Sequence, residues 1–411
     1  DEALATELPM GGDKIDPADY PRLRQEGLDK ELQSMRDFRV YEEHSTFQLP
    51  ESISRAALPT VWVEKVKNGR VKMRLVCQGF YQSHLEKDDV YASTPLLPSL
   101  KFLLALALQR DYSINFADVS TAFLHADLEE EIWVVPPPEV NPNGDKLWKL
   151  LKAMYGLRSA PKAWQEHFAK VMATLGFRRL KSEPNVYVNS DTGVMVLSYV
   201  DDLLYSGPKD ECVKFYKDLG EQLIIKSTGN LNKIGNTVYF LGRKLQRTTD
   251  GIGFSALQEY YDDIFQMLRL DKGNPTRTTG SADVKLPGDG VSLLSKEDHA
   301  IYRSCVGKIL WLAPIRPDIS YAVKELSRSL REPTEEDKAK LKHLARYLRG
   351  TSDYVLLITT KCGYSDDVPG IVEVYVDSDW AGCHKTRKAT TGVCVFYNGV
   401  LIHHYSRTQA T

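Results

Sequence analysis

The sequence predicts a mixed α/β protein with more than one domain. It has 411 residues, which is more than one hydrophobic core usually organises, so we expect two to four domains. β-like runs and helical patterns alternate through the first 255 residues, whereas helical patterns dominate from 257 to 349 and strands return afterwards. This order predicts an α/β body, then a helical connection, then the beginning of a second α/β domain.

Composition limits the class of protein only loosely. The 42% hydrophobic and 26% charged residues are ordinary for a soluble globular protein. The longest apolar run, 102–108, is too short to cross a bilayer, and no basic-then-apolar leader opens the chain, so we expect neither a membrane span nor secretion. The six cysteines include no Cys-x-x-Cys pair, so we expect reduced, mostly buried thiols. The net charge of −2 still permits a local basic cleft.

The first 255 residues show the alternation of helices and strands most clearly. Residues 21–38 carry spaced apolar side chains typical of an amphipathic helix. Runs at 61–66 and 71–76 flank Asn68-Gly69, a strong hairpin signal. A helix at 161–175 is favoured by Pro161 in its first turn and Gly176 just beyond its end. Further expected elements are helices at 98–109 and 211–223, and strands at 113–119, 132–135, 185–188, 194–206 and 238–246.

Beyond residue 256 the apolar spacing becomes helical. The expected helices lie at 257–270, 296–312, 317–331 and 335–349, with a loop at 272–292, and the expected strands lie at 354–359, 371–377 and 392–397. Basic residues gather at 65–74, 178–181 and 338–349. Such clusters contact nucleic-acid phosphates without choosing a sequence, although a merely solvated face explains each of them as well.

The sharpest chemical feature is the run Tyr199-Val-Asp-Asp-Leu-Leu204, in which β-forming residues flank two adjacent acids. In a hairpin this pattern places Asp201 and Asp202 at the tip, with Val200 and Leu203 anchoring the strands. Two carboxylates so close repel each other, and a divalent cation relieves that repulsion. The competing interpretation is an acidic β-turn, since Asp is a common turn residue.

A third acid, Asp118, ends the apolar run 114–119. An unpaired charge is costly to bury there, so a carboxylate on an adjacent strand is well suited to complete a site for two Mg²⁺ ions. Taken alone, Asp118 is better explained as a strand-end acid that caps a loop.

Several motifs, in order, resemble copia-type (Ty1/copia) retrotransposon reverse transcriptases. They are Asp118-Val-Ser-Thr-Ala-Phe-Leu-His-Ala-Asp-Leu128, Tyr155-Gly-Leu-Arg-Ser-Ala-Pro-Lys-Ala-Trp164, Tyr199-Val-Asp-Asp202 and Tyr239-Phe-Leu-Gly242. The similarity continues through Arg303–Leu310, Arg316–Ile319 and Arg346–Gly350, and so spans nearly the whole chain. Ala126 and Cys77 depart from the residues usual in the family, and neither is a matched metal ligand.

The resemblance implies a right-hand polymerase with fingers, palm and thumb, followed by a connection and a truncated RNase H-like α/β domain. The implied segments are an N-terminal extension (1–50), fingers and palm (51–255), thumb and connection (256–352) and the RNase H-like part (353–411). It further implies RNA-directed DNA polymerase activity, with Mg²⁺ as cofactor and Mn²⁺ as an alternative ion.

Site residues follow from the same match. Asp118, Asp201 and Asp202 are implied as catalytic metal ligands, with Val119 as a further ligand. Lys72 and Arg74 are implied to reach the nucleotide triphosphate, Phe123 to exclude a ribose 2′-OH, and Tyr155-Gly156 to contact the incoming nucleotide. Phe240, Leu241 and Gly242 match the primer grip. From the residues alone, Phe123 is also explained as a core side chain, Gly156 as part of a helix-entry turn, and Lys72 and Arg74 as a solvated strand face.

Asp377, in Val374-Tyr-Val-Asp-Ser-Asp-Trp-Ala-Gly382, resembles the first metal ligand of the family's RNase H domain. The remaining ligands are expected beyond Thr411, so we expect no RNase H activity from this chain. Asp191-Thr-Gly193 spells an aspartic-protease tripeptide but is better explained as a turn between strands.

The sequence is compatible with two functions: an active reverse transcriptase, and a decayed or domesticated copy that only binds nucleic acid. Expected partners are an RNA template, a DNA primer and template, deoxynucleotides, and the rest of a polyprotein with protease, integrase and the remainder of RNase H. The family implies cytoplasmic virus-like particles as the location, with the nucleus as an alternative. Oligomeric state is left open.

Overall fold

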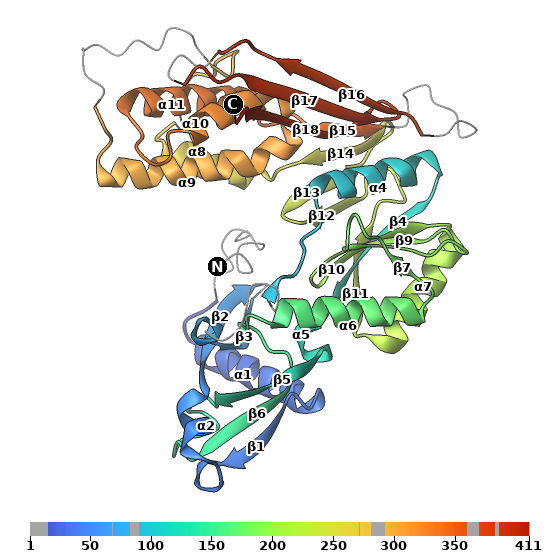
Figure 1. Ribbon diagram of the computed structural model, residues 1–411, viewed down its shortest axis with the longest axis vertical. Helices are drawn as coiled ribbons and strands as arrows, with labels where there is room; N and C mark the ends of the chain where they lie inside the picture. Colours follow the sequence, from blue (N-terminus) through green and yellow to red (C-terminus); the bar gives the residue numbers. More distant parts are fainter. Residues whose placement is uncertain are drawn as a thin grey trace. The chain divides into compact units, whose positions relative to one another are not determined.

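Figure 1 shows the chain as a computed structural model. Contacts group the chain into two compact units, Asp1–Pro95 with Phe116–Thr228, and Leu96–Asn115 with Gly229–Thr411. The structure describes residues 15–67, 69–82, 90–270, 272–280, 292–359, 370–382 and 386–410. Outside these ranges lie Asn68 of the predicted turn and parts of the predicted N-terminal extension, of the loop 272–292 and of the RNase H-like segment.

The first unit holds a five-stranded sheet in the order β1-β6-β5-β2-β3 (Figure 1). The predicted hairpin is confirmed, because β2 and β3 pair antiparallel with Lys65 opposite Lys72. Buried side chains from β5 and β6, including Val134 and Trp148, fill the core beneath it. The strands are β1 (Tyr41–Ser45), β2 (Leu58–Lys67), β3 (Arg70–Cys77), β5 (Asp127–Val135) and β6 (Lys146–Lys152), with helix α2 (Glu51–Ala56) between β1 and β2.

Helix α1 (Tyr20–Asp37) confirms the predicted helix and packs against β3. Its apolar stripe, Leu28, Leu32 and Met35, is buried. A Cβ on Gly27 would lie 2.5 Å from the Val71 carbonyl oxygen, so this approach of helix to strand requires glycine. Residues 20–45 therefore belong to the five-stranded layer, whereas the sequence predicted an extension over 1–50.

A six-stranded sheet follows, in the order β11-β4-β10-β9-β8-β7. Helices α6 and α7 supply Trp164, Phe168, Phe215 and other apolar side chains to a core on one face of this sheet. The elements are β4 (Ser113–Val119), α5 (Ala122–His125), α6 (Ala160–Thr174), β7 (Arg178–Arg179), β8 (Val186–Val188), β9 (Met195–Tyr199), β10 (Asp202–Gly207), α7 (Lys209–Gln222) and β11 (Ile225–Asn230). Asp191-Thr-Gly193 lies in the β8–β9 connection, as predicted.

The second unit confirms the helical stretch. Its helices are α4 (Leu97–Gln109), α8 (Gln258–Met267), α9 (Lys296–Leu312), α10 (Ser320–Ser327) and α11 (Glu335–Gly350). One of its sheets contains the strands β12 (Thr237–Phe240), β13 (Arg243–Arg247), β14 (Gly251–Ser255) and β15 (Leu356–Thr359). Another contains the strands β16 (Val372–Ser378), β17 (Thr390–Tyr397) and β18 (Val400–Thr408). The predicted helix at 317–331 is instead a 3₁₀ turn at Pro317–Ile319 followed by α10.

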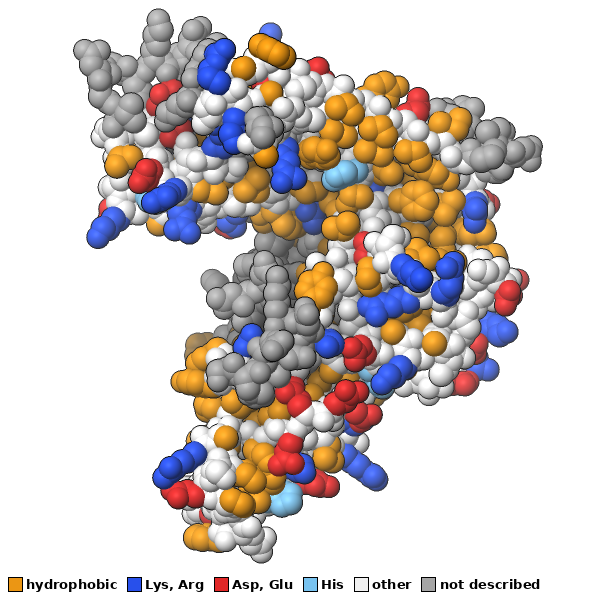
Figure 2. Space-filling view, viewed as in Figure 1, with side chains coloured by type: hydrophobic (Ala, Val, Ile, Leu, Met, Phe, Trp, Pro, Cys, Tyr) orange, Lys and Arg blue, Asp and Glu red, His pale blue; other side chains and the backbone are white. Residues whose placement is uncertain are grey.

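Strand β15 pairs with β14 and not with the β16-β17-β18 sheet. This pairing joins strands on either side of the predicted thumb and connection segment, 256–352, whose boundaries remain predictions. Hydrophobic side chains, Val374 and Val376 among them, are exposed along β16, in a region where Figure 2 shows many such side chains.

Among the described cysteines, Cys77, Cys212 and Cys305 are free and buried, and Cys394 is free and half-buried; Cys362 and Cys383 lie outside the described residues. Among the helices in the described ranges, none is both long and apolar enough to cross a membrane.

Candidate active site

The hairpin β9–β10 presents the predicted acids at a tight turn. Tyr199 pairs with Asp202, which leaves Val200 and Asp201 as the two turn residues. The indole N–H of Trp164, on α6, donates to the Val200 carbonyl oxygen at 2.7 Å and so fixes the turn from below. Leu203 is fully buried and anchors the hairpin, but Val200 has a φ of +53° and is 37% exposed. The expectation that Val200 anchors a strand is therefore wrong.

Strand β4 brings Asp118 to the same turn. The N–H of Val119 donates to the Asp201 carbonyl oxygen at 2.7 Å. Ala117 and Val119 pack into the core under α6 and α7, as do Leu203 and Tyr205 of β10. Since successive strand residues point to opposite faces, Asp118 and Asp202 lie on the face away from that core.

The electrostatics of the two central acids favour a cation. Burial raises the pKa of Asp118, and nearby Lys72, Lys226 and Arg74 partly oppose that shift. Burial also raises the pKa of Asp201, with the charge of Asp118 adding to the effect. A carboxylate whose ionised form is disfavoured by desolvation and by a like charge gains from a divalent ion at that position.

Asp118 and Asp201 lie close enough for the charge of Asp118 to act on Asp201, but the acids do not form a complete set of metal ligands. Among the residues that the structure describes, no three His, Cys, Asp or Glu side chains are grouped so as to hold a metal ion. Asp202 begins β10, and its direction is fixed by the pairing with Tyr199. Val119 is buried and has an apolar side chain, so it has only its carbonyl oxygen to offer a metal.

The predicted nucleotide-binding side chains form a stack beside these acids. The Arg74 guanidinium lies 4.8 Å from the centre of the Tyr155 ring. That ring meets Phe123 edge-on, with centroids 5.3 Å apart and planes at 82°. Burial raises the pKa of the Tyr155 hydroxyl to about 12, and the charges of Asp201 and Asp118 contribute. Lys72 acts electrostatically on both acids, so the two predicted groups of residues share one site.

Gly156 holds the loop that carries Tyr155 against strand β3. Its φ is +86°, and a Cβ there would lie 2.1 Å from the Cys77 carbonyl oxygen. The N–H of Cys77 in turn donates to the Tyr155 carbonyl oxygen at 2.7 Å. Gly79 has a similar constraint, since its Cβ would lie 2.2 Å from the Gly156 carbonyl oxygen. The predicted helix-entry turn is therefore a close approach of two backbones.

Glu31 is a neighbour of this site that the sequence reasoning missed. Helix α1 places its carboxylate near Arg74 and Lys72, where it accepts a hydrogen bond from the Leu75 backbone. Strand β3 is the edge of its sheet, so it has N–H groups that face away from β2. The feature of the sequence that could have indicated Glu31 is its position next to Leu32, in the apolar stripe of the predicted helix.

Burial raises the pKa of the Glu31 carboxyl, so its stabilising contribution is lost as pH rises. Replacing Glu31 by Gln is expected to raise the melting temperature at pH 8 and to change it little at pH 4. Thermal unfolding across this range measures the difference. Glu26→Gln, at an exposed position on the same helix that pairs with Arg22 at 2.6 Å, is the control. An equal effect of both variants at both pH values would contradict the interpretation.

The predicted primer grip forms the turn between β12 and β13 in the second unit. Phe240 pairs with Arg243, so Leu241 and Gly242 are a two-residue turn, with φ of +51° and +71°. Two left-handed residues match the twist of a hairpin. Phe240 is buried and anchors the turn.

Asp377 lies on β16 opposite Gly392, and its carboxylate accepts the N–H of Ser378 at 2.9 Å. It joins no metal-binding group among the described residues.

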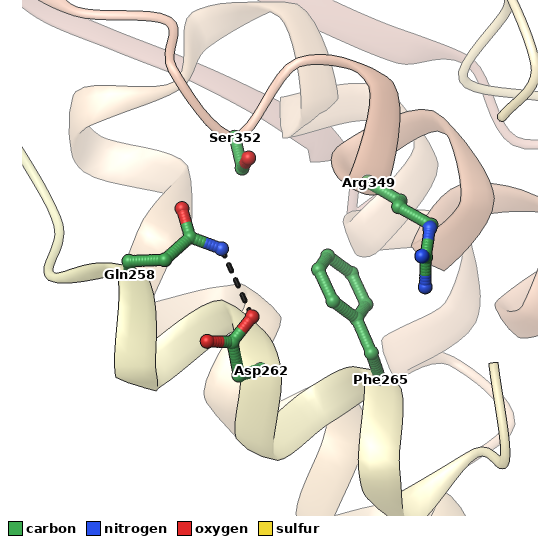
Figure 3. A pocket seen from close by; sticks show the side chains of 5 residues that line it. All are labelled: Gln258, Asp262, Phe265, Arg349 and Ser352. Atoms are coloured by element: carbon green, nitrogen blue, oxygen red, sulfur yellow. Dashed lines mark hydrogen bonds between the residues drawn. The ribbon is translucent and has the colours of Figure 1, made fainter. Parts of the chain in front are cut away.

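A separate cavity of about 310 Å³ lies between the start of α8 and the end of α11 (Figure 3). Three of its polar side chains have partners within the protein, since Gln258 donates to Asp262 at 2.9 Å and Arg349 donates to the Leu270 carbonyl oxygen. Phe265 and Ser352 complete the lining. This cavity contains none of the predicted site residues.

Residues 41–281 match the family described as reverse transcriptase (RNA-dependent DNA polymerase). The chain belongs to this family. Relatives of this reverse transcriptase are retrotransposon proteins of the Ty1/copia type. It is 30% identical, over 93% of its length, to the retrovirus-related Pol polyprotein from transposon TNT 1-94 of Nicotiana tabacum, and it covers 29% of that protein.

The transposon Ty5-1 protein of Saccharomyces cerevisiae is 31% identical over 69% of this chain and 89% of its own length. The Pol polyprotein from transposon RE2 of Arabidopsis thaliana is 29% identical, and the chain covers 24% of it. The reverse transcriptase thus spans less than a third of these plant polyproteins.

A foamy viral protease-reverse transcriptase, solved in complex with double-stranded DNA, has a similar fold with a TM-score of 0.54 at 13% identity. The match covers 98% of this chain and 59% of that one. The predicted mixed α/β reverse transcriptase fold is therefore confirmed.

Proposed function

We propose that this chain is an active RNA-directed DNA polymerase, which adds deoxynucleotides to a primer 3′ end on an RNA or DNA template. The observation that carries the proposal is the contact between β4 and the β9–β10 turn, which sets Asp118 beside Asp201. The stack of Arg74, Tyr155 and Phe123 lies at the same site.

Asp118, Asp201 and Asp202, with the Val119 carbonyl, are proposed to hold two Mg²⁺ ions, and Mn²⁺ is an alternative. What supports a cation there is the burial of Asp118 and Asp201 and the charge of Asp118, which raises the pKa of Asp201. When bound, the ions lower the pKa of the primer 3′-hydroxyl and neutralise charge on the leaving pyrophosphate.

The other residues bind and orient the reactants. Arg74 is proposed to leave the Tyr155 ring and bind the triphosphate through its planar fork, and Lys72 adds a point charge. The Phe123 ring occupies the space of a ribose 2′-OH and so favours deoxynucleotides. Tyr155 and Gly156 face the incoming nucleotide, and the turn Phe240–Gly242 holds the primer terminus.

Partners and location follow from the family and are proposals too. We expect RNA template, DNA primer and template, deoxynucleotides and the rest of a Pol polyprotein as partners, and replication in cytoplasmic particles, with the nucleus as an alternative. RNase H activity is not expected of these 411 residues, because one matched ligand, Asp377, does not make a two-metal site.

Extension of an oligo-dT primer on poly-A template with dTTP tests the proposal. We expect incorporation with Mg²⁺, loss of incorporation when EDTA removes the ion, and recovery when Mg²⁺ is restored in excess. Tight binding of the primer-template duplex without any incorporation under these conditions would favour the nucleic-acid-binding scaffold and overturn the proposal.

A further inference from the structure

The C-terminal end of helix α9 is surrounded by basic side chains from three other elements. Arg243 of β13 donates to the Trp311 carbonyl oxygen at 2.8 Å. His404 of β18 donates from Nε2 to the Ala313 carbonyl oxygen at 2.9 Å, and Lys101 of α4 donates to the Pro314 carbonyl oxygen. Carbonyl groups at a helix C-terminus lack helical partners and carry the negative end of the helix dipole. The side chains of Arg243 and Lys101 supply donors to the Trp311 and Pro314 carbonyl oxygens, and His404 adds a second donor to the Ala313 oxygen, which also accepts the N–H of Arg316; Ala313 and Pro314 belong to the 3₁₀ turn Ala313–Ile315 that follows α9.

The two strongest bases of this set are buried without a carboxylate. Lys101 is 2% exposed and Arg243 is 7% exposed. In the described part of the chain, neither makes an ion pair with an acidic side chain. Burial lowers the pKa of Lys101 to about 8 and that of Arg243 to about 10. Carbonyl groups of the helix end therefore compensate these charges in place of acids.

Arg243 makes additional contacts that Lys101 does not make. Its guanidinium lies 4.0 Å from the centre of the Trp311 ring. Its Nη1 lies 3.4 Å from the carbonyl oxygen of Leu241, in the β12–β13 turn. The same indole packs under that turn, because a Cβ on Gly242 would lie 3.3 Å from Trp311 Cζ2. Trp311 is held in turn by the Tyr260 ring, with centroids 4.5 Å apart.

We propose that Arg243 is a positioning residue for the primer terminus. It fixes the Leu241–Gly242 turn onto Trp311 at the rigid end of α9, so the turn meets the primer in one geometry. The inference rests on the proposed polymerase function, in which this turn holds the primer 3′ end. Lysine does not replace Arg243, because it lacks the planar fork that stacks on an indole while donating to two carbonyl groups.

Arg243→Lys tests the proposal, with Lys101→Met as the matched control. Both variants weaken the cap of α9, but only the first alters contacts to the turn. The single-turnover rate of first nucleotide addition is expected to fall about tenfold or more in Arg243→Lys, since small misplacement of a reacting group is costly. Lys101→Met is expected to lower the melting temperature and to keep the rate within about twofold.

Hydrogen exchange of residues 237–246 measures positioning without activity. Arg243→Lys is expected to speed exchange in this segment relative to Lys101→Met. Trp311→Phe keeps a ring under the turn, so it is expected to change both the exchange and the rate of nucleotide addition less than Trp311→Ala does. A wild-type rate in Arg243→Lys, or an equal loss of rate in Lys101→Met, would overturn the inference. If the wild-type protein adds no nucleotide, the proposed polymerase function is refuted. The positioning role is tested independently of activity, and it is refuted if hydrogen exchange of residues 237–246 is the same in Arg243→Lys as in the wild type.

Discussion

Replacing Asp118 by Asn is expected to reduce primer extension about 1,000-fold or more, since a metal ligand at the reacting atoms supplies several kcal/mol. Asn keeps the size of the side chain and removes the charge that attracts Mg²⁺. The loss should appear in the single-turnover rate at saturating primer and deoxynucleotide. Asp377→Asn, which changes an exposed acid in the β16 strand, is the control and should retain wild-type extension. Comparable extension by Asp118→Asn and wild type would remove Asp118 from the site.

The same variant separates loss of metal from loss of fold. Burial raises the pKa of Asp118, so its ionised form destabilises the folded state at neutral pH, and this penalty grows as pH rises through that pKa. Asn carries no such penalty, so Asp118→Asn should melt at or above the wild-type temperature without metal. Mg²⁺ should then raise the melting temperature of the wild type and not of the variant, because only the wild type binds it in the folded state.

Replacing Gly156 by Ala is expected to lower the free energy of unfolding by about 3 kcal/mol or more, since left-handed strain and backbone overlap act together. A Cβ would lie 2.1 Å from the Cys77 carbonyl oxygen and 2.5 Å from Val76 Cγ1, so β3 and the Tyr155 loop must separate. Urea unfolding measures the loss. Because Tyr155 moves with the loop, the remaining folded protein should also have a raised KM for deoxynucleotide.

Gly144→Ala is the matched control. Gly144 has a φ of +66° but nothing within 4 Å of the added Cβ. This variant therefore carries the left-handed penalty alone, about 1 kcal/mol. Equal destabilisation by the two substitutions would show that the β3 contact adds nothing at Gly156.

Local patterns predicted most of the individual elements. Alternating residues around Asn68-Gly69 indicated the β2–β3 hairpin, and Pro161 with Gly176 indicated α6, because these signals depend on neighbours in sequence. Long-range pairing could not be predicted from such patterns. The strand at 356–359 joins β14, about a hundred residues earlier, and no local feature encodes that choice.

By itself, the sequence predicted a hairpin at Tyr199–Leu204 that carries the two acids, because β-forming residues flank them on both sides; the structure places Asp201 in the turn and Asp202 at the start of β10. The sequence also determined the family, through the order of its motifs. Only the tertiary structure decided how β4 meets the Asp201 turn, that Glu31 of α1 lies near Arg74, and that Arg243 joins the β12–β13 turn to the end of α9. These three contacts depend on burial and strand order across distant segments, and spacing along a chain carries no record of either.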